Sequence, residues 1–470
     1  MDNAEDNSTV IFTSSEYENL NLIINHSLNL QSNNSIIKSN LTEPVFKIIN
    51  TNNVSIGNFI INSKGTSIHC ENSNNIVIKD TTITSDNNAI LFNGVSNGQI
   101  INNNLLNNKN SGLLIIRSNR ISISNNTIEN SVNDGIILQG SVTNTNITYN
   151  QLLHNGIYTN YAINLISQNP NDRQSNIFIA YNNISDNGNG INVNITTNKL
   201  NITENAIVRG AKGVNLDQGY YKSDTSLYID YNAFVQGSDL CIDARGSKYE
   251  EVGGIVVGYN WFNRNSNNGF ICPKVIAGIL QSNIRQIGEN TYQVYFTEDG
   301  KEINTLADFN LRIKIDGKIG YSSVTNGLAT FTVPGEVGSE SDVVLGADET
   351  IKLKVNQYTK PVTPNKNSNT QREIIGNGSG SSSGDYSQGS VSEANGNPNP
   401  TSASSSSSVA SSASSTSPSD ANSDGSSQVI KTLTYDEDSF RVIGIPGLLF
   451  LIIFAILVYY NEDIRKALKR

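Results

Sequence analysis

The chain has 470 residues, 16% of them charged, and a formal net charge of −10. This acidic balance excludes a nucleic-acid partner held by a basic surface. One methionine, three histidines and three cysteines, none of them grouped, make neither a soft-metal site nor a disulfide framework, so we expect no metal and no cofactor.

Residues 1–14 are polar and are expected to be disordered, and residues 15–50 are predicted to cap the domain that follows. The opening MDNAEDNSTV has no apolar stretch of the kind found in signal peptides. Because later segments predict export, we expect the start of an exported chain to be missing. The alternative is a tail-anchored cytoplasmic protein.

A short motif recurs between residues 51 and 275. Its pattern is Ile-x-x-Asn-x-Ile, with leucine or phenylalanine also found at the last position. It begins at Ile101, Ile123, Ile147, Ile179, Ile202, Ile229 and, with valine first, Val257. Most steps between neighbouring motifs are about 22 to 24 residues, a period that indicates stacked supersecondary units.

Each repeat is predicted to form one coil of three short strands. The residue two positions before the motif is mostly apolar, so it shares a strand face with the first isoleucine. The motif asparagine and the last apolar residue have the opposite parity, which indicates a corner. A third apolar pair, such as Ile90 and Phe92 or Leu240 and Ile242, supplies the last strand. Two earlier units without the asparagine, 56–61 and 78–83, bring the total to about nine coils over residues 51–275.

The motif asparagine points inward at the corner, where a buried amide must be hydrogen-bonded. We therefore predict a structural ladder of stacked amides, formed by Asn104, Asn126, Asn150, Asn182, Asn205, Asn232 and Asn260. An outward column of tyrosines lies beside it, at Tyr149, Tyr181, Tyr231 and Tyr259. Ring stacking that stabilises the coils is the favoured role for this column, and a sugar-stacking surface is the alternative.

The same register places the cysteines. Cys70 and Cys272 fall at core-facing positions and Cys241 falls outside, which favours buried thiols over a Cys241–Cys272 bridge. A glycine often opens the third strand, as a turn with positive φ would require, at Gly112, Gly135, Gly190, Gly213 and Gly269.

The period stops near residue 280. Alternating strands joined by Asp-Gly and Asn-Gly turns predict a small β-sandwich at 281–358. Residues 359–440 are rich in serine and asparagine and predict a disordered stalk. The uncharged run at 442–460 is long enough for a transmembrane helix. Basic residues within 461–470 predict a cytoplasmic tail, with the rest of the chain outside the cell.

The coils resemble the right-handed parallel β-helix repeats of the NosD-type and pectate-lyase-like superfamily. The stretch LNLQSNNSIIKSNLTEPVFKIINTNNVSI resembles the first coils of archaeal surface adhesin-like proteins, and the resemblance extends over residues 15–275. It implies an all-β, right-handed parallel β-helix. The module at 281–358 resembles the immunoglobulin-like modules of archaeal surface proteins.

Three coils have a longer turn after the third strand, which forms loops at 167–176, 217–226 and 243–254. Because all three insertions occur in the same turn, we expect them to stack on one edge of the solenoid. Charged and aromatic side chains on protruding loops favour binding, and ordinary solvated turns are the alternative. The candidate ligand-binding residues are Asp172, Arg173, Tyr220, Tyr221, Lys222, Asp224, Asp243, Arg245, Lys248, Tyr249 and Glu250.

Enzymes of the superfamily include lyases, polygalacturonases and epimerases. Such chemistry uses Ca²⁺ with a basic residue, or two to three close carboxylates. The best group here is Asp239, Asp243 and Arg245, but both aspartates lie outward or in turns by the register. We therefore predict no catalysis, with a polysaccharide lyase or hydrolase acting through the same loops as the alternative.

The sequence thus predicts a membrane-anchored, single-pass, adhesin-like protein of the cell surface, with its N-terminal region extracellular. Glycoprotein character is also expected, because Asn-x-Ser/Thr sequons are frequent. The expected partners are glycans or the surfaces of other cells, bound through the three loops. A structural protein of the cell envelope is the further alternative.

Overall fold

A computed structural model describes residues 4–156, 159–216, 226–235, 241–244, 255–266 and 278–359. All the elements in these ranges are strands. In this part of the chain no helix is long and apolar enough to cross a membrane. The predicted stalk beyond residue 359, the apolar run at 442–460 and the basic tail at 461–470 lie outside the described residues.

One flank of the solenoid is a ten-stranded parallel sheet, called sheet B here, with one strand from each coil. The described part of the chain therefore contains about ten coils, two of them before residue 51, where the sequence predicted about nine coils over residues 51–275. The strands in spatial order are β3 (Leu22–Ile24), β5 (Phe46–Ile49), β7 (Ile68–Glu71), β10 (Ile90–Asn93), β13 (Leu113–Ile116), β16 (Ile136–Gln139), β19 (Tyr161–Ile166), β22 (Asn189–Asn194), β25 (Val214–Leu216) and β28 (Ile242–Asp243).

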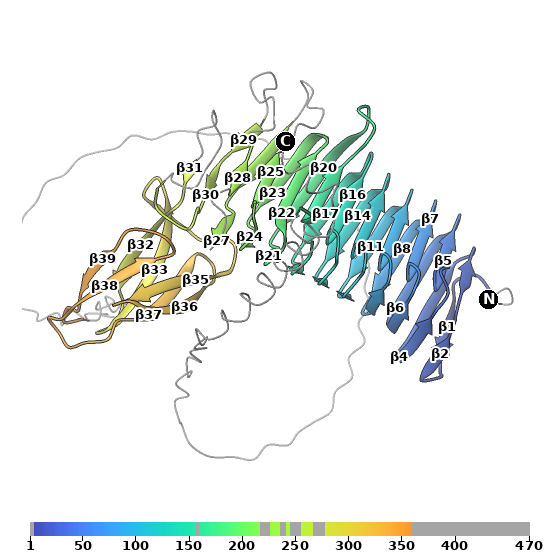
Figure 1. The fold of residues 1–470 in the computed structure, drawn as a ribbon, viewed down its shortest axis with the longest axis horizontal. Coiled ribbons are helices and arrows are strands. Elements are labelled where there is room, and N and C mark those ends of the chain that lie inside the picture. Colours follow the sequence, from blue (N-terminus) through green and yellow to red (C-terminus); the bar gives the residue numbers. More distant parts are fainter. Residues whose placement is uncertain are drawn as a thin grey trace, which may run out of the picture. The chain divides into compact units, whose positions relative to one another are not determined.

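The rest of each coil belongs to a 19-stranded parallel sheet, called sheet A, which bends at a corner (Figure 1). Before the corner lie β1 (Ser8–Phe12), β8 (Asn74–Lys79), β11 (Ser96–Ile101), β14 (Asn119–Ser124), β17 (Thr143–Thr148), β20 (Arg173–Ala180), β23 (Thr196–Thr203), β26 (Leu227–Asp230) and β29 (Ile255–Val257). After it lie β2 (Glu16–Glu18), β9 (Thr82–Ser85), β12 (Asn104–Leu106), β15 (Thr127–Glu129), β18 (Gln151–Leu153), β21 (Asn183–Ser185), β24 (Ala206–Val208) and β27 (Ala233–Val235). Two long strands, β4 (Leu28–Ser39) and β6 (Asn52–Ser63), run through the corner.

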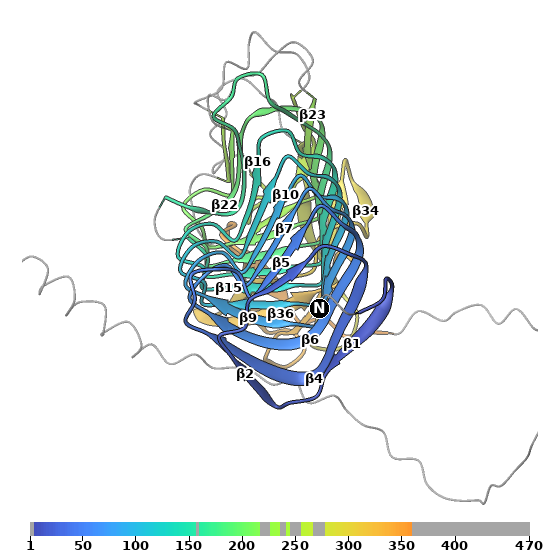
Figure 2. The same cartoon turned by 90° about the vertical axis from the view of Figure 1, so that its right-hand side faces the viewer.

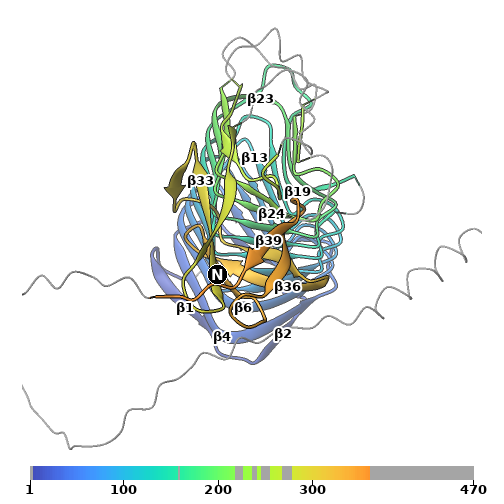
Figure 3. The same ribbon diagram turned by 90° about the vertical axis from the view of Figure 1, so that its left-hand side faces the viewer.

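Inward side chains of successive coils stack in register, as the period-2 pattern predicts. Ile68 pairs with Ile90 and Ile90 with Leu113 along sheet B, and all three side chains are fully buried. Figures 2 and 3 show the three-sided outline of the coils around this core. The parallel β-helix therefore rests directly on strand pairing, and each coil buries its apolar face against its neighbours.

The N-terminal prediction is wrong for residues 8–50. Strand β1 lies inside the segment expected to be disordered, and β2 to β5 form ordinary coils where a separate cap was expected. Phe12 is the reason, because its ring meets Phe46 at 6.2 Å and Phe59 at 5.0 Å, both edge-on. The aromatic contacts fill the core of the first coils. Many of the residues between these phenylalanines are polar, so the composition of the segment does not indicate a core.

From Asn102 to Tyr231 the corner residue of sheet A has a positive φ, and the buried asparagine that follows it belongs to the inner ladder. Asn126 donates from Nδ2 to Asn150 Oδ1 at 3.0 Å and to the carbonyl of Ile100 at 2.8 Å. Six of the seven predicted asparagines take part: Asn126, Asn150, Asn182, Asn205, Asn232 and Asn260. Asn104 is exposed, and its neighbour Asn103 occupies the ladder position instead. Ile100, not Ile101, aligns with the core residues Ile78 and Ile123, which shifts the motif by one residue.

The glycines that open sheet B strands serve close approach between coils, and their φ is not positive. A Cβ on Gly112 would lie 2.8 Å from the carbonyl oxygen of Gly135, and a Cβ on Gly135 would lie 2.6 Å from that of Ala162. Cys241 stands at this position in the β28 coil, because Val214 pairs with Ile242 and not with Leu240. Cys241 is therefore buried, which corrects its predicted outside position, as is Cys70. Gly269 and Cys272 lie outside the described residues.

A pair of short strands, β30 (Tyr259–Asn260) and β31 (Gly278–Ile279), follows the last coil. Beyond them the chain forms two antiparallel four-stranded sheets. The first sheet contains β32 (Gln281–Gln286), β33 (Thr291–Glu298), β34 (Lys301–Ile303) and β37 (Leu328–Thr332). The second contains β36 (Lys318–Val324), β35 (Phe309–Ile315), β38 (Glu340–Leu345) and β39 (Ile351–Lys354). Both contribute to one buried apolar cluster.

The tight turns of this module follow the predicted dipeptides. Asp299–Gly300, Asp316–Gly317 and Asn326–Gly327 each have two consecutive positive φ angles, the geometry that a hairpin turn of this kind needs. The likeness to immunoglobulin-like modules stays a prediction.

Candidate functional site

Two of the three predicted binding loops lie mainly outside the described residues. The loops follow β19, β25 and β28 along one edge of sheet B. The loop at 167–176 is described, and in Figure 1 the segment before β20 extends beyond the turns of the preceding coils. Eight candidate residues fall outside the described ranges: Tyr220, Tyr221, Lys222, Asp224, Arg245, Lys248, Tyr249 and Glu250.

In the described loop, Asp172 holds the backbone in shape. Its carboxylate accepts hydrogen bonds from Ser141 Oγ at 3.0 Å and Ser167 Oγ at 2.6 Å. Arg173 begins β20, and its amide donates to Ser141 Oγ at 3.4 Å. Gln174, which the sequence analysis did not single out, is fully buried and donates to the carbonyl of Leu138 at 2.9 Å. The loop is thus tied to the preceding coil by polar contacts.

Asp243 lies on the outer face of sheet B and is nevertheless 4% exposed. Its Oδ2 is 3.0 Å from Lys212 Nζ, so the two side chains form an ion pair. Lys212 lies in the segment before β25, and Asp243 lies in the neighbouring strand β28. A buried carboxylate requires such a partner. The register predicted Asp243 outward or in a turn, at the start of the loop 243–254, whereas it ends β28 and is buried.

The outward column of sheet B changes composition where the loops begin. In the first six coils it is Ile23, Lys47, His69, Leu91, Leu114 and Ile137. In the next four it is Asn164, Asn192, Asn215 and Asp243. Mixed and apolar side chains thus give way to amides and a carboxylate over four successive coils, three of which carry the insertions.

These polar residues form a continuous hydrogen-bonded chain, called the outer ladder here. Asn164 Nδ2 donates to Asp134 Oδ2 at 2.9 Å, and Asn192 Nδ2 donates to Asn164 Oδ1 at 2.9 Å. Asn215 Nδ2 donates to Asn192 Oδ1 at 2.8 Å.

The same amide of Asn215 reaches Tyr161 Oη at 3.1 Å. Lys212 Nζ donates to Asn215 Oδ1 at 2.8 Å and thereby joins the outer ladder to Asp243.

The outer ladder has two kinds of member. Asn192, Asn215 and Asp243 are buried, whereas Tyr161, Asn164 and Lys212 are half-buried and reach solvent. Buried partners therefore fix the orientation of a phenol, an amide and an ammonium group that a ligand can touch. Such fixed contact groups lower the ordering cost of binding.

Asp134 ends the outer ladder at its N-terminal side. Burial raises the pKa of its carboxyl, and the hydrogen bonds from Asn164 and the Tyr161 amide oppose this shift. Asp134 bonds to β19 and Asp243 lies three strands further on, in β28. At about 4.8 Å per strand the two carboxyls are roughly 14 Å apart. That separation exceeds the approximately 5–9.5 Å between the paired carboxylates of glycoside hydrolases.

Of the outer ladder, only Asp243 was among the candidate ligand-binding residues predicted from the sequence. The outward column could have been identified from the sequence. Each of its residues lies between the two core residues of a third strand, as Asn164 does between Ile163 and Leu165. Asparagine is so frequent here that the column's three asparagines were not distinguished from turn residues, and Asp243 was a candidate only as a loop residue. Among the described residues, no group of three or more histidine, cysteine, aspartate or glutamate side chains could hold a metal ion.

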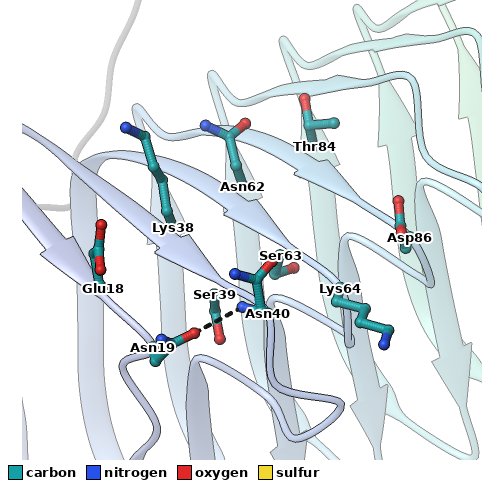
Figure 4. Close-up of a pocket in the computed structure, with 10 residues that line it drawn as sticks. All are labelled: Glu18, Asn19, Lys38, Ser39, Asn40, Asn62, Ser63, Lys64, Thr84 and Asp86. Carbon is teal, nitrogen blue, oxygen red and sulfur yellow. Dashed lines mark hydrogen bonds between the residues drawn. The ribbon is translucent and has the colours of Figure 1, made fainter.

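A hollow lies over the first coils (Figure 4). It has a volume of about 410 Å³ and is lined by Glu18, Asn19, Lys38, Ser39, Asn40, Asn62, Ser63, Lys64, Thr84 and Asp86. Its charges are partly paired, since Lys38 lies 2.7 Å from Glu16 and Asp86 lies 2.8 Å from Lys109. Nothing in its open, polar lining selects a ligand.

Comparison with known proteins found no matching family model and no matching curated protein. Solved structures do match. The A-module of a mannuronan C-5 epimerase from Azotobacter vinelandii is 16% identical, with a TM-score of 0.38, over 58% of this chain and 87% of that one. An endo-xylogalacturonan hydrolase from Aspergillus tubingensis is 12% identical, with a TM-score of 0.43, over 58% and 87%.

The surface adhesin PfbA of Streptococcus pneumoniae is also similar. It is 14% identical, with a TM-score of 0.37, over 64% of this chain and 92% of that one. Carbohydrate-active enzymes and an adhesin thus occur together among the similar structures. At these identities and TM-scores the likeness carries no argument for either function, and the pairing of the strands alone shows the parallel β-helix.

Proposed function

We propose that this chain is a non-catalytic glycan-binding protein whose ligand lies along the outer ladder of sheet B. The observation that carries the proposal is the change of the outward column to Asn164, Asn192, Asn215 and Asp243 in four successive coils, three of which bear the insertions. Function here belongs to the part of the solenoid that departs from the repeat.

Hydroxyl-rich ligands suit this surface. A sugar hydroxyl both donates and accepts a hydrogen bond, and so does an asparagine amide. Tyr161 and Asn164 present such groups at the surface, Lys212 presents a donor only, and the buried members keep all three oriented. The inserted loops follow the same strands and would border the ligand.

Catalysis is the second candidate, as a polysaccharide lyase or hydrolase that uses the same loops. Tyr161, Lys212 and Asp243 are groups that could transfer protons. Against this, the carboxyls of Asp134 and Asp243 are about 14 Å apart, too far for joint acid and base work. Release of reducing or unsaturated sugar ends that stops in an Asp243→Asn, Arg245→Gln double variant would replace the binding proposal with this one.

Display on a cell surface completes the proposal. The serine-rich segment at 359–440 suits a solvated stalk, and the uncharged run at 442–460 suits a membrane anchor. Together they would hold the solenoid away from a membrane, where it meets glycans or the surfaces of other cells.

The test is a glycan-binding screen with the full chain, followed by three variants. Tyr161→Phe, Asn164→Leu and Lys212→Met remove one contact group each, and leucine already occupies this column in other coils. We expect each variant to weaken binding about 3- to 30-fold, the equivalent of one hydrogen bond to a neutral or charged group. Matched controls are Tyr321→Phe on the C-terminal module and Lys109→Met on the first coils. Full affinity in all three variants would exclude the outer ladder as the site.

A further inference from the structure

The corner of sheet A carries aromatic residues where its backbone favours asparagine. The corner residue has a positive φ in successive coils, 56° at Asn102 and 55° at Asn125, and then 58° at both Tyr149 and Tyr181. Asparagine tolerates this left-handed conformation, whereas a large side chain adopts it at a steric cost. The presence of the two tyrosines at this corner therefore requires an explanation.

For a third corner tyrosine, Tyr231, a contact explains why tyrosine occupies the corner. Tyr231 donates from Oη to Glu298 at 2.8 Å and so contacts the turn between β33 and β34. Tyr149 and Tyr181 are different, because they are 55% and 38% exposed. Their rings stack on each other at 4.8 Å with an interplanar angle of 9°.

Phe178 extends this pair across the face of sheet A. Its ring centroid lies 6.4 Å from that of Tyr181. Between them in sequence, Ala180 lies on the outer face and is fully buried, as expected beneath a layer of rings. We call Tyr149, Phe178 and Tyr181 the aromatic corner.

Amides and acids surround the aromatic corner. Asn146 and Asn201 flank Phe178 in register on the neighbouring strands. Tyr181 donates from Oη to Glu204 Oε1 at 3.3 Å. Asp230 lies one coil beyond the Glu204 corner, and its charge acts on the Glu204 carboxyl. The surroundings of the aromatic corner therefore offer hydrogen-bonding groups and negative charge.

We propose that the aromatic corner is a second glycan site, which takes a neutral pyranose chain. It lies on sheet A, apart from the outer ladder, and does not depend on the function proposed for sheet B. The C–H faces of a pyranose ring are apolar and cover aromatic surface, while its hydroxyls reach the amides of Asn146 and Asn201. Glu204 and Asp230 disfavour a polyuronate, since like charges repel.

The experiment uses the full chain in mild detergent, made in a host without N-glycosylation because Asn146 and Asn201 each begin an Asn-x-Thr sequon. Xyloglucan, galactomannan and hydroxyethyl cellulose serve as neutral probes and polygalacturonate as the anionic probe. The test variant is Tyr149→Asn with Tyr181→Asn, because asparagine is the residue of the same corner at Asn102 and Asn125. Tyr321→Asn, at another exposed tyrosine, is the matched control.

We expect the double variant to bind a neutral probe about tenfold more weakly, with an unfolding midpoint no lower than that of the parent chain. The control should keep full affinity. Unchanged binding in the double variant would overturn the proposal, as would a preference for polygalacturonate or the absence of any neutral glycan bound. Self-association that the same substitutions abolish would assign the surface to a second copy of the chain and also overturn it.

The outer-ladder variants separate the two sites. A loss of glycan binding confined to Tyr161→Phe, Asn164→Leu and Lys212→Met would support the site on sheet B and exclude the aromatic corner as a glycan site. A loss confined to the double tyrosine variant would do the reverse.

Discussion

At the residue scale, one buried amide per coil stabilises the corner of sheet A. Asn126 Oδ1 accepts the backbone amide of Asn103 at 2.9 Å, while its Nδ2 donates to the carbonyl of Ile100. One side chain thus satisfies two backbone groups of the preceding coil. Without it these groups would stay buried without partners, which costs about 1–3 kcal/mol for each.

This predicts different effects for two adjacent substitutions. Asn103→Ala should lower the free energy of unfolding by about 1–3 kcal/mol, because Asn103 Nδ2 bonds to Asn126 and to the carbonyl of Ile78. Asn104→Ala should change it by less than about 0.5 kcal/mol, because Asn104 is exposed. Chemical denaturation followed by circular dichroism measures both. Equal effects would contradict the register described above.

The same pair shows what the sequence can and cannot predict about a ladder. Two isoleucines, Ile100 and Ile101, precede three asparagines, so the motif fits in two frames. Pairing with Ile78 and Ile123 selects the frame, and that information lies in the neighbouring coils. At the other ladder positions only one asparagine lies three residues after an isoleucine or valine, so the prediction has one solution.

At the element scale, the C-terminal module contacts the end of the solenoid through aromatic residues. Trp261 follows β30 and is fully buried, with its ring 5.3 Å from Phe296 and 5.1 Å from Phe309. Two phenols add hydrogen bonds at the β33–β34 turn, Tyr231 to Glu298 at 2.8 Å and Tyr259 to Asp299 at 2.6 Å. The module therefore packs against Trp261 at the described end of the solenoid.

These phenols predict a loss of this contact at alkaline pH. The hydrogen bond to Glu298 raises the pKa of Tyr231 to about 12, from 10.0. Since the pKa is higher in the folded state, the contribution is complete below about pH 10 and disappears as the pH rises through about 12. Trp261 is the single tryptophan, so its emission maximum should shift to the red over this range.

The comparison is with Tyr231→Phe combined with Tyr259→Phe. This variant cannot ionise at the contact, and its emission should change less between pH 10 and 12. The Tyr321→Phe variant should follow the parent chain. An identical pH profile in the double variant would show that the phenols do not contribute to the contact.

Element positions were predictable to different degrees. The strands of the module follow alternation and turn dipeptides, which are local signals. The first coils were misread because Phe12, Phe46 and Phe59 make a cluster only after three coils have stacked. Cys241 was misplaced for the same reason, since its burial depends on which residue of β28 pairs with Val214.

At the scale of the whole molecule, the repeat predicts the scaffold and says little about the sites. Stacking of coils demands inward apolar residues, so that pattern is visible throughout the chain. Outer faces are free to vary, and there the outer ladder and the aromatic corner differ from the repeat by only one residue per coil. Such changes become meaningful only when strands from several coils are placed side by side.

Surface display predicts where the chain is found in a cell. If 442–460 anchors the chain, the full chain should sediment with membranes and resist extraction by salt or alkaline carbonate, whereas a chain ending at residue 440 should be released. Protease added to intact cells should cut the serine-rich stretch at 359–440 and free the solenoid, because solvated segments of low complexity are cut most readily. A cytoplasmic marker protein checks that the cells stay closed. Complete protection of the solenoid in closed cells would place it inside and remove the display proposal, while leaving both glycan sites open to the binding tests.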